Sequence, residues 1–172
     1  MRENPFTLTY DAIWGMLEAH PGFVADVKEG NRIKYNLDVD RDPLKQQILP
    51  ADLIEVVIAQ TNVTANLFIS SSGSMCTRQY NILVSTGDWR YTRYLAQVEW
   101  DVYTATMLWK ERLGALTWKG KTFVKRANIV GASSGAADPE RNRGIKGWSG
   151  VWTVEVEMHF SSNDLLKVAK GE

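Results

Sequence analysis

The sequence contains one cysteine, Cys76, among 172 residues, so no disulfide can form within the chain. This excludes the small secreted domains that several disulfides hold together. No apolar run approaches the ~20 residues that a membrane-spanning helix requires. Residues 1–10 lack the apolar centre of a secretory signal. We therefore expect a soluble protein that is made inside the cell.

An excess of charge of one sign is also missing, because 20 Lys and Arg side chains balance 20 Asp and Glu side chains. Domains that bind nucleic acid through bulk electrostatics are usually basic, and this class is disfavoured, although a local basic patch stays open. With 44% hydrophobic and 23% charged residues, the composition is that of a globular protein. The length fits one domain with a sizeable core.

Residues that carry out chemistry are sparse. There are two histidines, His20 and His159, and no CxxC, HExxH or EF-hand spacing that would hold a metal. The glycine-rich segment 131–135 lacks the Gly-Lys-Ser/Thr ending of a phosphate-binding loop. We expect no catalytic residue, metal or cofactor. A nucleophilic pair of Cys76 with a histidine is the alternative for an enzyme.

Apolar periodicity predicts two principal helices. The first begins at an N-cap on Thr9 and ends before Pro21. Its histidine, His20, then lies at the helix C-terminus, where the helix dipole favours it. The second helix runs from an N-cap at Asp88 to about residue 113, with Gly114 as its C-cap.

Alternating or β-branched apolar runs predict the strands. These runs cover residues 33–39, 53–59, 61–69, 75–85, 118–130 and 148–161. Residues 131–147 hold four of the 13 glycines and predict a flexible arm that orders on contact. Residues 163–172 predict a frayed end or one helical turn. This order predicts one α+β domain over residues 1–172, a mainly antiparallel sheet flanked by an N-terminal helix and a long central helix.

The long helix has two apolar stripes. The first faces the core and consists of Tyr91, Leu95, Val98, Val102, Ala105 and Trp109. The second lies roughly 150° away around the helix and consists of Ala96, Trp100, Tyr103 and Met107. A helix that lies on a sheet should be polar there, so this second stripe needs cover. Either the N-terminal helix covers it or another subunit does.

The last strand and the tryptophans supply the remaining patterns. The strand points Trp152, Val154, Val156, Met158 and Phe160 to one face and Thr153, Glu155, Glu157 and His159 to the other. Of the seven tryptophans, we expect at least two to stay partly exposed until a partner binds.

The order of elements and the segment Gly147-Trp148-Ser149-Gly150-Val151-Trp152-Thr153-Val154-Glu155-Val156-Glu157-Met158 resemble the tail terminator (tail completion) proteins of tailed bacteriophages and related particles. The resemblance implies a fold similar to the tail-tube fold and a structural role, not an enzymatic one. It implies a homohexameric ring that caps the tail tube, ends its polymerisation and joins it to the neck or connector. The protein would then belong to the virion tail or neck, assembled in the host cytoplasm, with DNA passing through the lumen without specific binding.

The resemblance gives roles to residues already singled out. Candidates for the subunit interface are Trp100, Tyr103, Met107 and Trp148. Candidates for an arm that reaches an adjacent subunit or the neck are Asp138, Glu140, Arg141, Arg143 and Lys146. Glu155 and Glu157 are the candidates for the lumen, where acidic walls would let DNA slide.

Three other interpretations stay open. A neck or head-completion protein would form a ring closer to the capsid, and co-assembly with the connector would distinguish it. A small-ligand-binding α+β domain would be a monomer with tryptophans around an apolar cavity. A hydrolase that uses Cys76 would lose its activity on alkylation.

Overall fold

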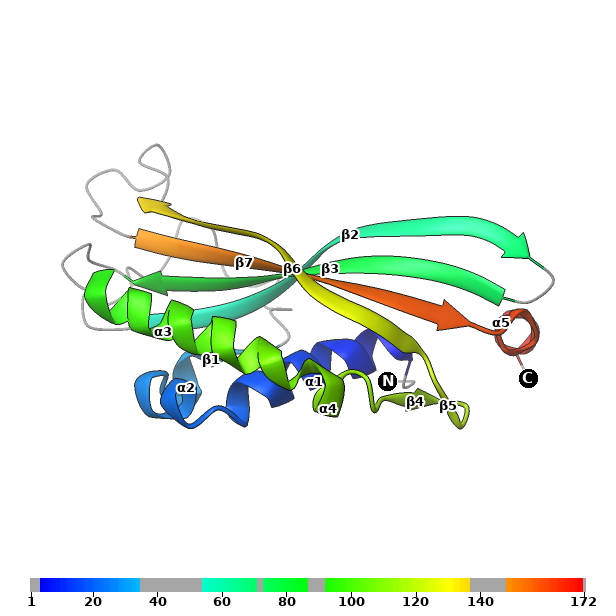
Figure 1. The fold of residues 1–172 in the computed structure, drawn as a ribbon, viewed down its shortest axis with the longest axis horizontal. Helices are drawn as coiled ribbons and strands as arrows, with labels where there is room; N and C mark the ends of the chain where they lie inside the picture. The colour runs from blue at the N-terminus through cyan, green and yellow to red at the C-terminus, as the bar shows by residue number, and fades with distance from the viewer. Residues whose placement is uncertain (1–3, 35–53, 71–72, 87–91, 137–147, 172) are drawn as a thin grey trace.

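The computed structural model describes residues 4–34, 54–70, 73–86, 92–136 and 148–171. A twisted five-stranded sheet in the order β1-β2-β3-β7-β6 carries helices α1, α2 and α3 on one face (Figure 1). None of the described helices covers the other face, which we call the open face. The expected α+β class is confirmed. The elements are α1 Pro5–Glu18, α2 Pro21–Asp26, η1 Glu29–Asn31, β1 Arg32–Ile33, β2 Ile54–Ser70, β3 Gly73–Thr86, α3 Thr92–Ala105, η4 Thr106–Leu108, α4 Trp109–Arg112, β4 Thr117–Trp118, β5 Lys121–Thr122, β6 Val124–Ala136, β7 Trp148–Phe160 and α5 Ser162–Lys170.

The centre of the sheet is the antiparallel pair β3 and β7, whose register runs from Ser74 opposite Phe160 to Thr86 opposite Trp148 without a shift. Strands β2 and β6 add antiparallel neighbours on either side, and β1 pairs with β2 in parallel. The expectation of a mainly antiparallel sheet is therefore confirmed. The predicted strands at 75–85 and 148–161 correspond closely to β3 and β7.

The core lies between this sheet and the helix layer. Its largest fully buried side chains include Trp14 from α1, Phe23 from α2 and Tyr80 from β3. Full burial of a large apolar side chain contributes about 1.5–3 kcal/mol, so these residues fix how the helices lie on the sheet. Among the described residues, no helix is long and apolar enough to span a bilayer.

Helix α1 begins five residues earlier than the sequence predicted. Asn4, not Thr9, is the N-cap: its side chain accepts hydrogen bonds from the backbone N–H groups of Phe6 and Thr7. The Thr7 hydroxyl accepts from the Asn4 N–H in return, which completes a capping box. Thr9 lies inside the helix, where it is buried and donates to the Pro5 carbonyl at 2.7 Å.

The long central helix is divided. Its predicted core stripe is confirmed for Leu95, Val98, Val102 and Ala105, all buried, whereas Tyr91 and the predicted N-cap Asp88 lie outside the described residues. The helix tightens into η4 and resumes as α4. Leu113, not Gly114, is the C-cap. A side chain at Gly114 would put its Cβ 2.8 Å from the Lys110 carbonyl oxygen, so close packing explains this glycine.

Several predicted segments have different bounds. The runs at 53–59 and 61–69 form one strand, β2, with a register shift between Gln60 and Val63. The run at 118–130 divides into the β4–β5 hairpin and β6. Lys119 and Gly120 have positive φ angles of 49° and 75° at the hairpin turn. Of the run at 33–39, residue 33 belongs to β1 and residues 35–39 lie outside the described ones.

Two segments that the sequence assigned to irregular structure are regular. The predicted arm at 131–147 was wrong in its first six residues, because 131–136 continue β6 and pair with β7. Residues 163–172, predicted to fray or to form one helical turn, lie mostly in the nine-residue helix α5, which is capped by Gly171 in the left-handed conformation with φ 79°. Small residues occupy the end of β6, and such residues have low strand propensity, which explains the error.

A glycine in β7 allows a close helix approach. Gly150 is buried, and a Cβ at this position would collide with the side-chain carboxylate of Glu99 in α3. Burial raises the pKa of Glu99. The glycine therefore lets a carboxylate lie against the strand backbone between helix and sheet.

The N-cap of α1 gives a direct test of the fold. Replacing Asn4 with Ala leaves the first-turn N–H groups without their partner and should lower the free energy of unfolding by about 1 kcal/mol. Denaturant unfolding measures this. Asn163→Ala is the matched control, because Asn163 lies exposed within α5, where alanine favours the helix. An equal loss of stability in both variants would contradict the assigned cap.

Candidate functional site

The second apolar stripe of the central helix, which runs from α3 into η4, is exposed. Trp100, Tyr103 and Met107 leave 58%, 38% and 62% of their surface accessible, and Ala96 is exposed as well. The alternative in which the N-terminal helix covers this stripe is therefore wrong. Side chains of this size and polarity are enriched where proteins meet. We call this surface, made of Ala96, Trp100, Tyr103 and Met107, the helix stripe.

The rings of the helix stripe continue onto the sheet. The ring centres of Trp100 and Tyr103 are 5.6 Å apart, and Tyr103 lies 5.7 Å from Trp152 of β7. Contacts of this kind stabilise aromatic pairs by about 0.5–1.5 kcal/mol beyond their burial. They hold the exposed rings in place, so a partner would meet a surface that is already ordered.

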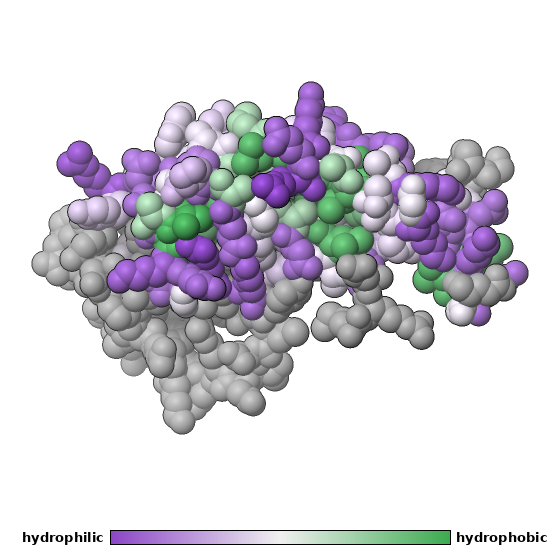
Figure 2. Space-filling view, turned by 90° about the horizontal axis from the view of Figure 1, so that it is seen from below, coloured by the Kyte–Doolittle hydropathy of each residue, from purple (hydrophilic) through white to green (hydrophobic). Residues whose placement is uncertain are grey.

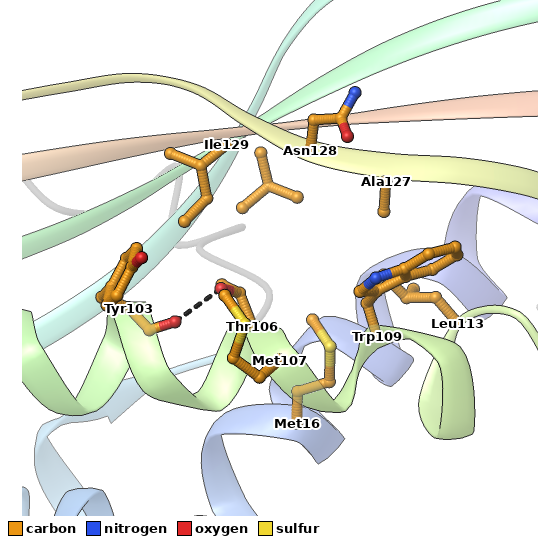
Figure 3. A pocket seen from close by; sticks show the side chains of 10 residues that line it. Met16, Tyr103, Thr106, Met107, Trp109, Leu113, Ala127, Asn128 and Ile129 are labelled. Atoms are coloured by element: carbon orange, nitrogen blue, oxygen red, sulfur yellow. Dashed lines mark hydrogen bonds between the residues drawn. The ribbon is translucent and has the colours of Figure 1, made fainter.

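A groove of about 310 Å³ begins where the helix stripe ends (Figure 3). Tyr103, Met107 and Trp109 line it from the helix side, and Ala127 and Ile129 of β6 line it from the sheet side. Met16 of α1 and Leu113 also reach it. The groove is largely apolar and lies along β6, the last strand of the sheet in the described part of the chain.

Local hydrogen bonds explain why the helix opens at this groove. The Thr106 hydroxyl donates to the Tyr103 carbonyl at 2.6 Å (Figure 3), and the Thr104 hydroxyl donates to the Trp100 carbonyl at 2.9 Å. Threonine hydroxyls that bond back to the preceding turn often bend helices. The helix tightens into η4 at this point, which separates Met107 from the core stripe.

Strand β6 contributes an irregularity on the other side of the groove. Its pairing with β7 shifts between Ile129 and Gly131, and Val130 between them is exposed. A bulge of this kind in an edge strand turns a side chain outwards. Val130 and Ile129 were not among the sequence candidates. Glycine inside a strand is a signal for a bulge, but the sequence pattern assigned Gly131 to the arm and not to the strand.

Exposed charged residues neighbour the groove-lining residues in sequence: Lys110, Glu111 and Arg112 of α4 and Lys125 of β6. Arg126, also exposed, lies opposite Glu157 in the β6–β7 register and therefore belongs to the other face of the sheet.

The open face of the sheet has the opposite character. Glu155 and Glu157 of β7 point away from the helices, as the alternation of the strand predicted, and both are partly exposed. Gln79 donates to Glu155 at 3.0 Å, and the ring of His159 lies 2.7 Å from Glu157. The neighbouring pair Thr153 and Asn81 is also hydrogen-bonded, at 2.9 Å. This face is thus polar, with two acidic side chains near its centre.

His20 lies between two helices, but it is not at a helix C-terminus as predicted. It is the N-cap of α2, and its Nδ1 accepts a hydrogen bond from the Phe23 N–H at 3.2 Å. Its Nε2 lies 2.9 Å from the Thr104 hydroxyl oxygen. That hydroxyl already donates to Trp100, so the network places the ring proton on Nε2.

Thr104, His20 and Asp101 resemble a nucleophile, a base and an acid only in composition. Asp101 lies 3.9 Å from Nδ1 of His20, but that nitrogen accepts a bond from the backbone and has no proton to donate to the carboxylate. A nucleophilic triad needs the opposite tautomer. The geometry instead supports a structural role, in which the histidine joins α2 to α3.

Cys76 and His159 do not form a reactive pair. Cys76 faces the helix layer and is buried, whereas His159 stands on the open face, opposite Met75 in the β3–β7 register. Burial also raises the pKa of the Cys76 thiol, which disfavours the thiolate. Within the described residues, no three acidic, cysteine or histidine side chains cluster as a metal site.

The other sequence candidates have mixed outcomes. The arm residues Asp138, Glu140, Arg141, Arg143 and Lys146 lie outside the described residues. Trp148 begins β7, opposite Thr86 and Ala136. Among the tryptophans, Trp14 is buried, Trp100 is exposed, and Trp109, Trp118 and Trp152 are intermediate. The expectation that at least two tryptophans are partly exposed is confirmed.

Comparison with known proteins adds no family: no protein-family model and no curated protein matches the chain.

Asp101 predicts how stability depends on pH. Burial raises its pKa, and the neighbouring Asp26 carboxylate adds to the rise, while His20 and Gln97 oppose it. The folded protein therefore holds this proton at pH values where the unfolded chain has lost it, so stability increases as pH falls through the raised pKa. Asp101→Asn should flatten this part of the profile. Thermal unfolding from pH 4 to 8 measures it, with the exposed Glu29→Gln as control; parallel profiles of all three chains would contradict the assignment.

Proposed function

We propose that this protein is a structural virion component that resembles phage tail terminators. It forms a ring, taken to be a hexamer, that caps the tail tube, ends its polymerisation and joins it to the neck or connector. No catalytic residue or cofactor belongs to this function. The protein would act in the virion tail or neck after assembly in the host cytoplasm.

One observation carries the proposal: an ordered aromatic and methionine surface stands uncovered on α3. Trp100 and Tyr103 are held by ring contacts, and Tyr103 and Met107 also line an apolar groove. Seen from the helix side, apolar patches stand among polar side chains (Figure 2). Covering a surface like this with another subunit lowers the free energy of the assembly, and a ring would supply that cover.

The open face of the sheet supports the same proposal. Glu155, Glu157 and their hydrogen-bonded neighbours form a polar surface, on which Arg126 of β6 stands opposite Glu157. In a ring, this face would line the lumen. Carboxylates repel phosphates, so DNA would pass without binding. The arm residues Asp138 to Lys146 would reach an adjacent subunit or the neck.

A neck or head-completion protein is the second candidate, because the same exposed surface serves either ring. The small-ligand domain is less well supported. The groove takes up one of the seven tryptophans, Trp109, where that interpretation needs several around a cavity. Its volume of about 310 Å³ also stands at the lower end for ligand pockets.

The decisive experiment measures native mass and images the protein by negative stain, alone and with tail tubes. A six-fold ring with an open centre, or a cap on tube ends, supports the proposal. Binding to the connector but not to tubes favours the neck protein. A monomer that ignores both would overturn the ring function and favour a search for ligands.

The helix stripe predicts the effect of one substitution. Trp100→Ser removes the most exposed ring of the stripe, so we expect copies to associate at least ten-fold more weakly, as loss of a central aromatic contact often costs about 2 kcal/mol. Native mass across a concentration series measures this. Tyr94→Ser is the control, because Tyr94 is 62% exposed on another side of α3. Unchanged association of Trp100→Ser would remove the stripe from the interface.

The acidic residues of the open face predict that reversing their charge creates DNA binding. Replacing Glu155 and Glu157 with Lys should make assembled rings retain DNA in low salt and release it as salt rises, because phosphates then meet cations. DNA retention on filters measures this. Asp11→Lys, on the exposed side of α1 in the helix layer, is the control for added charge. Equal retention by the control, or none by the double variant, would place Glu155 and Glu157 outside the lumen.

A further inference from the structure

The methionines among the described residues differ in how far solvent reaches them. Met16 and Met158 are enclosed, with 1% and 0% of their surface accessible. Met75 is half-buried on the open face, opposite His159. Met107 leaves 62% of its surface accessible. A small oxidant in the solvent therefore reaches the thioether side chain of Met107 more easily than the other three.

The exposure of Met107 is set by the backbone. The Thr106 hydroxyl donates to the Tyr103 carbonyl at 2.6 Å where the helix tightens into η4, and Met107 follows directly. Figure 3 shows Met107 and Met16 at the same groove, one from η4 and the other from α1. The groove thus contains its own comparison, one methionine open to solvent and one enclosed.

The cysteine is the other sulfur group that an oxidant attacks, and it is protected. Cys76 is buried, and burial raises the pKa of its thiol. The thiolate, not the thiol, is the form that peroxides oxidise. An enclosed thiol that keeps its proton reacts slowly, so Met107 is the first sulfur that an oxidant meets in the described part of the chain.

We propose that Met107 is a redox-sensitive modification site, at which hydrogen peroxide forms methionine sulfoxide and thereby closes the helix stripe and the groove to an apolar partner. The sulfur lone pair attacks one peroxide oxygen, so that an S–O bond forms as the O–O bond breaks. The proton of the transferred hydroxyl passes to the leaving hydroxide, which is released as water. The sulfur loses two electrons and the peroxide gains them. Methionine sulfoxide reductases return the sulfur to the thioether, so the change is reversible.

The sulfoxide changes the polarity of the surface at the place where a partner would cover it. Its oxygen accepts hydrogen bonds from water, and burying a polar group without a replacement partner is unfavourable. The groove lining is largely apolar, and the Thr106 hydroxyl within it already donates to Tyr103. This consequence rests on the proposed association of copies, in which the helix stripe becomes buried.

Peptide mass spectrometry after brief treatment with dilute hydrogen peroxide tests the site. The full chain is treated at low protein concentration, where copies are separate. We expect sulfoxide to form several-fold faster at Met107 than at Met16, the enclosed methionine of the same groove, and faster than at Met75. A rate at Met107 no higher than at Met16 or Met75 overturns the modification site.

Native mass across a concentration series tests the consequence, with each chain compared with its own untreated sample. The wild-type chain should associate several-fold more weakly after treatment. Met75→Leu keeps Met107 and should lose as much. Met107→Leu should show no change on treatment, because leucine has a similar volume but no sulfur to oxidise. A loss in Met107→Leu as large as in the wild-type chain overturns the role of Met107.

Failure of this proposal and failure of the proposed function give different results. If Met107 is oxidised and copies associate as strongly as before, the effect on association is overturned and the ring stands. If untreated copies neither associate nor cap tubes, the proposed function fails and the effect on association fails with it. The peptide map alone then decides the modification site.

Discussion

Antiparallel pairing between β3 and β7 is the constraint on which the two faces of the molecule depend. Their register continues from Ser74–Phe160 to Thr86–Trp148 without interruption, so every second residue is assigned to the same face along the whole pair. Tyr80 and Val154 face the helices, while Gln79 and Glu155 face outwards. A slip of one residue would bury the carboxylates and expose the core, and the free-energy cost of that exchange keeps the register fixed.

The apolar side chains of the central helix are only partly buried against this face of the sheet. Helix α3 buries Leu95, Val98 and Val102 against the sheet, yet it also carries the exposed Trp100 and Tyr103, whose rings continue toward Trp152 of β7. Threonine hydroxyls then draw the backbone into η4, and the groove opens between this turn and the edge of the sheet. The exposed apolar surface is thus built into the end of a helix that is firmly anchored on its other side, which makes it a consequence of the fold and not of loose packing.

The spacing of apolar residues predicted the features that depend on long, regular helices and strands. The core stripe of α3, the alternation of β7 and the α+β class all follow from spacings of 3.6 or 2 residues. The ends of the helices and strands did not follow from these spacings, because they depend on single interactions. Asn4, and not Thr9, is the N-cap of α1 because Asn4 and Thr7 form reciprocal hydrogen bonds. Residues 131–136 were assigned to the arm because small residues signal a loop, whereas pairing with β7 holds them in a strand.

The groove could not be predicted from the sequence, for a different reason. Met16, Met107 and Ile129 come from three distant parts of the chain, and no local pattern states that they meet. What the sequence did predict was the excess of apolar surface on α3, since the count of stripes on one helix needs no tertiary information. The exposed stripe could therefore be predicted, and its boundary with the groove could not.

An assembly that surrounds a charged polymer such as DNA would need its apolar subunit contacts and its DNA-facing surface on different faces of the subunit. Contacts between subunits gain free energy from apolar burial, whereas a passage for DNA must offer neither cations nor large apolar groups to the phosphates and bases. Placed on the same face, the two demands would conflict, because basic groups such as Lys110 and Arg112 would also face the polymer. The pleat of the sheet keeps two such surfaces apart: the strand that carries Glu155 outwards carries Val154 and Val156 into the core beneath α3, so the acidic surface and the exposed apolar surface stay on opposite sides for as long as the strand pairing holds.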